Sequence, residues 1–92
     1  MTKTVLVRPG LAVGCRLHWD RVRKQRVLLF PEGALTLNQT AATVLELCDG
    51  QRDIDEIATI LSERYAGADV RDDVVELLTA IAAKGFVVDA SE

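Results

Sequence analysis

The order of apolar and polar positions along the chain changes its period near residue 38. Before that point it follows the period of two typical of strands, and afterwards a period near 3.6, typical of helices. Cys15, Leu17 and Trp19 alternate with Arg16 and His18, so a half-buried strand is predicted over residues 15–20. The preceding segment, rich in proline and glycine, predicts an extended arm that is flexible through residues 1–10.

Two further strands are predicted before residue 38. The stretch RVLLF, residues 26–30, is apolar on both faces, which is typical of a central strand covered on both sides. Pro31 and Gly33 favour a turn. The last strand, Ala34–Leu37, is short and has no later strand in the sequence to cover its outer edge.

Three helices are predicted after the strands. Each begins at a side chain that caps a helix N-terminus, and two of them end at a glycine, which tolerates the left-handed backbone conformation there. These signals are Asn38 and Gly50 for the first helix, Asp53 with Glu56 for the second, and Asp69 and Gly85 for the third. The apolar residues 86–88 form a tail that packs back. The order βββααα predicts an α+β fold, winged-helix-like, with a three-stranded antiparallel sheet followed by three helices in a single domain, residues 1–92.

The third helix argues against DNA binding, the usual function of winged-helix domains. Its outward face carries Asp72, Asp73 and Glu76. A helix that enters the major groove needs Arg or Lys there, because it lies between phosphates. The net charge of −3, from 11 basic and 14 acidic residues, gives no general attraction to nucleic acid either. A DNA-binding winged helix stays the less favoured alternative.

The third helix is also apolar over a wider arc than one packing surface requires. Beside the inward stripe of Val70, Val74, Leu77, Leu78 and Ile81 runs a second line: Arg71, Val75, Leu78 and Ala82, with Thr79 adjoining. Either the domain or a dimer covers this extra surface, or it forms the wall of a groove. The groove interpretation gains support from the open edge of the last strand. A peptide could add a strand there by β-augmentation, along Ala34, Leu35, Thr36 and Leu37.

The sequence contains no recognisable catalytic or metal-binding pattern. The only nucleophile or base candidates are Cys15, Cys48 and His18, and their spacing forms neither a triad nor a zinc site. We interpret the cysteines as small buried hydrophobes in a reducing compartment, with a metal site or a disulfide as the alternatives. No catalytic residue, metal or cofactor is predicted.

The basic residues gather in the predicted turn between the first two strands, at Arg21, Arg23, Lys24 and Arg26. This cluster is either a docking patch for the acidic surface of a partner or a solvated hairpin tip. No apolar run approaches the ~18–20 residues that span a bilayer, and the N-terminus lacks the features of a signal peptide. We therefore expect a cytoplasmic protein without a membrane partner.

The chain also resembles a known family. The stretches RPGLAVGCRLHWD, VLLFPEGALTLNQTAATVLELCDGQRDIDEIATIL and RDDVVELLTAIAAKGF are similar to PqqD, a family of small proteins of pyrroloquinoline quinone (PQQ) biosynthesis. The likeness extends from about Arg8 to Val87, and the run LLFPEG, with LN and DG behind it, is fairly specific. Phe86 stands where the family often has Trp, so an aromatic is kept.

The resemblance implies a function without catalysis. Members of this family are peptide chaperones and the prototype of the recognition element for ribosomal peptides that are later modified. The family binds the precursor peptide PqqA and presents it to the radical SAM enzyme PqqE, which crosslinks a Glu and a Tyr. The leader is expected along the third strand, in the cleft against the third helix. The same domain occurs in other peptide-modification pathways, so another precursor is the alternative. The resemblance further implies a monomer or a segment-swapped homodimer.

Overall fold

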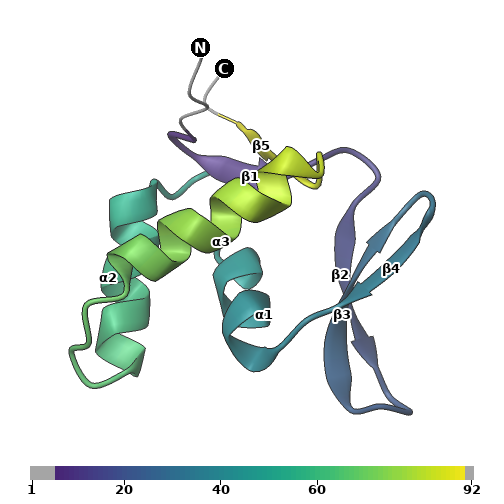
Figure 1. The fold of residues 1–92 in the computed structure, drawn as a ribbon, viewed down its shortest axis with the longest axis horizontal. Helices are drawn as coiled ribbons and strands as arrows, with labels where there is room; N and C mark the ends of the chain where they lie inside the picture. The colour runs from purple at the N-terminus through teal and green to yellow at the C-terminus, as the bar shows by residue number, and fades with distance from the viewer. Residues whose placement is uncertain (1–5, 91–92) are drawn as a thin grey trace.

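A computed structural model describes residues 6–90, and its elements confirm the α+β class. Their order along the chain is β1 (Pro9–Leu11), β2 (Arg16–Asp20), β3 (Gln25–Phe30), β4 (Gly33–Thr36), α1 (Gln39–Glu46), α2 (Ile54–Arg64), α3 (Arg71–Ala83) and β5 (Val87–Asp89). The predicted order βββααα is therefore incomplete. β1 and β5 pair antiparallel as a second, two-stranded sheet that brings residues 9–11 beside residues 87–89 (Figure 1).

The predicted flexible arm is ordered where it enters this small sheet. Pro9 and Gly10 belong to β1, and both are buried. The Gly50 N–H donates to the Pro9 carbonyl (3.0 Å), and the Ala90 N–H donates to the Arg8 carbonyl (2.8 Å). These partners lie far away in the sequence, which is why the local proline and glycine content did not reveal the strand. The part of the predicted arm over residues 1–5 lies outside the described residues.

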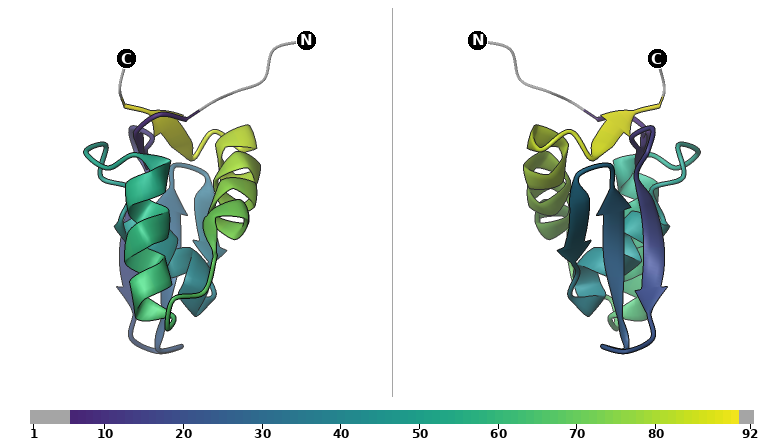
Figure 2. Two further views of the ribbon diagram at one scale, coloured as in Figure 1. Left: turned by 90° about the vertical axis from the view of Figure 1, so that its left-hand side faces the viewer. Right: turned by 90° about the vertical axis from the view of Figure 1, so that its right-hand side faces the viewer.

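The three-stranded sheet has the order β2-β3-β4, so the prediction that RVLLF forms the central strand is confirmed. Cover on both faces is not observed, because the helices lie behind one face only (Figure 2). Leu28 points into that layer and is 0% exposed. On the other face, Val27 is also buried, at 7% exposed, and its cross-strand partners are His18 and Thr36. Trp19, expected on the buried face, is 48% exposed.

The N-termini of α1 and α2 follow the sequence signals, whereas that of α3 does not. The Asn38 side chain accepts a hydrogen bond from the Ala41 N–H (2.7 Å) and caps α1. Asp53 and Glu56 form the predicted capping box of α2. At α3 the cap residue is Val70, one position later than predicted, and the Asp69 carboxylate accepts from the Arg71 N–H at 3.3 Å.

The end of α1 differs from the prediction. The helix ends at Glu46 rather than continuing to Gly50. Asp49 forms a bridge to Gly10, and Gly50, with φ +79°, donates its N–H to β1. The glycine thus has the left-handed conformation that the sequence suggested. It uses that conformation to pair with a strand instead of closing the helix.

The core is aliphatic and takes side chains from both sheets and all three helices. Its most deeply buried side chains are Leu28, Val44, Leu45, Ile57, Leu61, Val74 and Leu78. Phe30 stacks on Phe86 with ring centroids 4.4 Å apart, which ties the β3–β4 hairpin to the segment behind α3. In the described part of the chain, no buried side-chain nitrogen or oxygen lacks a hydrogen-bond partner.

Candidate functional site

The outer edge of β4 carries backbone groups without a strand partner. Among residues 6–90, β4 pairs only with β3. The Leu37 N–H donates to the Arg26 carbonyl (3.1 Å), so this cross-strand pair is hydrogen-bonded. Hydrogen-bonded and non-bonded pairs alternate in an antiparallel ladder. Leu35 therefore turns its backbone groups toward β3, while Ala34 and Thr36 turn theirs toward the open edge.

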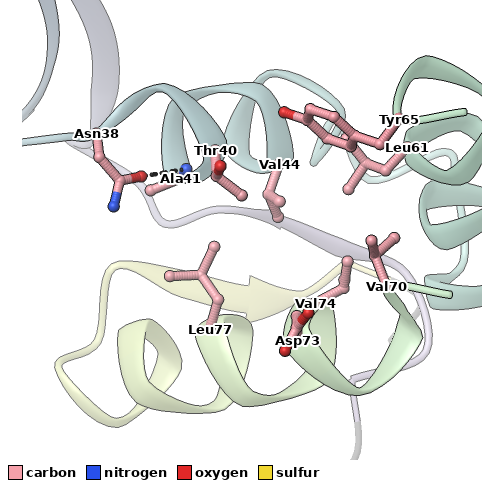
Figure 3. A pocket seen from close by; sticks show the side chains of 10 residues that line it. All are labelled: Asn38, Thr40, Ala41, Val44, Leu61, Tyr65, Val70, Asp73, Val74 and Leu77. Atoms are coloured by element: carbon pink, nitrogen blue, oxygen red, sulfur yellow. Dashed lines mark hydrogen bonds between the residues drawn. The ribbon is translucent and has the colours of Figure 1, made fainter. Parts of the chain in front are cut away.

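A groove of about 160 Å³ lies between α1 and α3. Thr40, Ala41 and Val44 form its α1 wall. The α3 wall comes from Val70, Asp73, Val74 and Leu77. One end of the groove is closed by Leu61 of α2 and by Tyr65, the C-cap of that helix. Asn38 lies at the other end (Figure 3). Most of these side chains are apolar. The arrangement provides an apolar floor with a few polar groups around it, as in sites that bind small ligands.

The groove continues from the open edge. Asn38 and Thr40 follow β4 directly in the chain and line the groove at the end where Leu77 lies (Figure 3). The view onto the sheet shows β4 as the edge strand on the side of α3 (Figure 2). An extended segment laid along β4 past Thr36 therefore reaches the mouth of the groove.

Two residues predicted to contact a peptide have no surface for it. Leu78 is 0% exposed and Leu37 is 5% exposed, because both side chains pack in the core. Leu37 nevertheless fixes the register of β4 through its backbone. Leu35 is partly buried against the core, and Ala34 and Thr36 are exposed.

The other predicted residues of α3 lie on a different flank of the helix from the groove. The Arg71 guanidinium is 2.7 Å from the Asp55 carboxylate, so this flank faces α2. Val75 lies one turn after Arg71, and Ala82 continues the same line, with exposed Thr79 beside it. The structure therefore does not bring Arg71, Val75, Thr79 and Ala82 to the groove beside β4.

The sequence did not predict the groove residues of α3, because the apolar stripe that contains most of them was assigned wholly to the core. Val70, Val74 and Leu77 were taken as inward, and Asp73 as outward. In the structure Val74 is buried, whereas Val70 and Leu77 are only partly buried and face α1 across the groove. The signal was present in the sequence, since the stripe contains more apolar residues than one packing surface needs.

The basic turn contains three of its four predicted members. Arg21, Arg23 and Lys24 lie in the loop between β2 and β3, where Lys24 adopts φ +56° and Arg23 approaches Asp20 at 4.0 Å. Arg26 belongs instead to β3 and forms a 2.9 Å ion pair with Glu46 of α1. We name Arg21, Val22, Arg23 and Lys24 the hairpin tip; its Val22 is 92% exposed.

One of the two cysteines, Cys48, lies in the core. Burial raises the pKa of the Cys48 thiol to about 12, with a smaller contribution from the Asp49 charge, so this cysteine stays protonated at neutral pH. Its Sγ donates to the Val44 carbonyl (3.2 Å). Across residues 6–90 there is no group of three or more His, Cys, Asp or Glu side chains that could hold a metal ion. No helix in that range is long and apolar enough to cross a membrane.

Comparison with known proteins gives consistent matches. The family model of coenzyme PQQ synthesis protein D (PqqD) matches residues 25–87. A PqqA binding protein of Klebsiella pneumoniae (strain 342) is 47% identical over 79 residues, 85% of this chain and 84% of the relative. A PqqA binding protein of Methylococcus capsulatus is 38% identical over 72 residues, 78% of this chain and 77% of the relative.

Solved structures agree with these matches. The solution structure of the PqqD truncation of Methylobacterium extorquens PqqCD, described as a functional and stand-alone recognition element for ribosomally synthesised and modified peptides, superposes with a TM-score of 0.75. It is 35% identical in sequence, with 87% of each chain covered. The crystal structure of PqqD from Xanthomonas campestris gives a TM-score of 0.54 at 34% identity, covering 90% of this chain and 94% of that one.

Proposed function

This chain belongs to the family of coenzyme PQQ synthesis protein D (PqqD), and from that premise we propose that it is a binding protein for the precursor peptide PqqA. The peptide is held for modification in PQQ biosynthesis, and the protein itself performs no turnover. The observation that carries the proposal is the open edge of β4 leading into the groove between α1 and α3.

The binding mode follows from the two halves of this site. PqqA adds as an antiparallel strand along β4, where the backbone groups of Ala34 and Thr36 provide hydrogen bonds that do not depend on side chains. Specificity then comes from the groove, since backbone bonds tolerate sequence change. Val74 and Leu77 supply its apolar surface on the α3 side.

We assign the hairpin tip to delivery of the peptide to PqqE. Arg21, Arg23 and Lys24 gather positive charge at the end of the β2–β3 hairpin, on a chain whose net charge is −3. Such a patch steers association with an acidic surface. In this proposal the complex forms in the cytoplasm, with one copy of this chain, or a segment-swapped pair, presenting the peptide.

A recognition domain for another modified-peptide pathway is the second candidate, because the β4 edge would accept any extended backbone. The relatives named PqqA binding protein favour the PQQ pathway. DNA binding is disfavoured, since Asp72, Asp73 and Glu76 are exposed on α3.

The test is calorimetry and amide NMR with a synthetic PqqA precursor peptide. We expect binding with heat release and shifts that cluster on β4, the α1 N-terminus and the groove side of α3. The proposal fails if the peptide does not bind, or if another precursor peptide binds more tightly. Shifts confined to α2 would contradict the site but not the function.

A further inference from the structure

The groove between α1 and α3 differs from a purely apolar pocket in one respect. Its floor is made by Ala41, Val44, Leu61, Val74 and Leu77, but Asp73 lines it as well. Asp73 is exposed and makes no ion pair within the described residues. It is the one charged residue of the lining, so the groove combines an aliphatic surface with a single negative charge.

The other polar groups of the lining add acceptors to the same space. The hydroxyls of Thr40 and Tyr65 both lie along the groove (Figure 3). The side-chain Oδ1 of Asn38 is already used, since it accepts from the Ala41 N–H at 2.7 Å. A hydroxyl and a carboxylate together favour a ligand that donates hydrogen bonds and carries positive charge.

The size of the groove limits the ligand to one side chain. Its volume is about 160 Å³, and an apolar cavity of ~150 Å³ holds one benzene molecule. A long side chain with a charged end fits such a space best when its methylene groups lie on the apolar floor and its head reaches the polar rim. Lys and Arg have this construction.

We propose that the groove selects a Lys or Arg of the bound peptide, with its stem on Val44, Val74 and Leu77 and its cationic head at Asp73. This inference rests on the proposed function and adds the chemical class of the anchoring residue. The groove lies beyond the C-terminal end of β4. In an antiparallel arrangement, the anchoring residue therefore precedes the segment of peptide that pairs with β4.

The decisive comparison uses two neighbouring carboxylates of α3. Asp73 lines the groove, whereas Asp72 belongs to the same first turn and does not. Asp73→Asn and Asp72→Asn remove the same charge from almost the same place. We expect Asp73→Asn to weaken PqqA binding about three- to tenfold, as for one partly exposed charged hydrogen bond, and Asp72→Asn to change it less than about twofold.

A peptide scan identifies the anchor. Each Lys and Arg of PqqA is replaced in turn by norleucine, which keeps the stem and removes the charge. We expect one such position, N-terminal to the segment that pairs with β4. There, the loss of binding free energy caused by norleucine should be smaller in the Asp73→Asn variant than in the unchanged protein. The proposal would be overturned if Asp73→Asn and Asp72→Asn weakened PqqA binding equally. It would also be overturned if, at every Lys and Arg of the peptide, the effects of norleucine and of Asp73→Asn on the binding free energy simply added.

A second measurement separates this inference from the proposed function. N-acetyl-lysine methylamide and its norleucine analogue are titrated into the full chain while methyl signals of Val44, Val74 and Leu77 are recorded. We expect shifts with the lysine probe that are lost in Asp73→Asn. If PqqA does not bind but these shifts occur, the pocket stands and the PQQ assignment fails. If PqqA binds and the two probes act alike, or neither shifts the methyls, the cation assignment fails.

Discussion

The backbone N–H of Leu37 donates to the carbonyl of Arg26 at 3.1 Å, and this one bond fixes which residues of β4 face the open edge. Because pairs alternate along the ladder, the N–H of Thr36 points outward and that of Leu35 points toward β3. The same strand therefore offers a test position and a matched control one residue apart.

Thr36→Pro should abolish binding of PqqA while circular dichroism shows the fold retained. Proline removes an N–H that only the added strand would use, and edge strands tolerate proline when that N–H faces outward. Leu35→Pro removes an N–H paired with β3 and should unfold the domain. If Thr36→Pro binds normally in calorimetry, the peptide does not pair with β4.

Leu77→Ser should reduce PqqA binding about tenfold, because it removes apolar surface on which the stem of the proposed anchoring side chain would lie. Val75→Asp provides the contrast, since it changes the flank of α3 that faces α2. We expect Val75→Asp and the remote Glu63→Gln to bind normally in the same assay. A loss with Val75→Asp alone would mean that the flank suggested by the sequence is the binding face.

Cys48 should resist alkylation in the folded protein at pH 8, while Cys15, which is partly exposed, reacts. Burial keeps the Cys48 thiol protonated, and thiolate is the reactive form. Mass spectrometry after iodoacetamide treatment checks this, with the urea-unfolded chain as the control in which both cysteines react. Modification of folded Cys48 would contradict its structural role.

The raised pKa of Cys48 also makes stability depend on pH. The thiol ionises near 9.0 when exposed by unfolding but only near 12 in the fold. The unfolded state therefore loses its proton first, and stability falls as pH rises from about 9 toward 12. In urea unfolding between pH 8 and 10.5, Cys48→Ala should have a lower free energy of unfolding at pH 8 than the unchanged protein. Its free energy of unfolding should then decrease less as the pH rises. If the free energy of unfolding decreased equally with pH in both proteins, the raised pKa of Cys48 would be contradicted.

Charge reversal at the hairpin tip, Arg21→Glu with Arg23→Glu, should slow association of the peptide-loaded protein with PqqE about tenfold or more at low salt. It should also weaken the salt dependence, since both effects come from electrostatic steering. Arg16→Glu serves as the control, because Arg16 is exposed on β2 outside the tip. If stopped-flow rates are unchanged by the tip variant, the tip is only a solvated turn.

The sequence predicted local structure better than long-range contacts. Asn38, Asp53 and Glu56 cap their helices as expected, because a capping interaction spans only three residues. The β1–β5 sheet was not predicted, since Pro9 pairs with Asp89 across nearly the whole chain. Pairing over such a separation leaves no periodic signal in a three-residue strand.

The candidate site was predicted only in part, because the groove also depends on contacts between elements that are far apart in the sequence. The open edge of β4 follows from its position as the last strand of the hairpin, which the order of elements reveals. Which flank of α3 lines the candidate groove depends on which side of the helix meets α1 and which meets α2. The Arg71–Asp55 pair reveals that choice in the structure, but helical periodicity alone treats both flanks of the apolar stripe as equivalent.

The central claim is that the peptide adds to β4 as a strand, and amide hydrogen exchange measures this most directly. On saturation with PqqA, the account predicts strong new protection at the N–H of Thr36 and Ala34. The N–H of Leu35, already bonded to β3, should change much less. Unchanged exchange at Thr36 and Ala34, in a sample where calorimetry shows the peptide bound, would contradict the account.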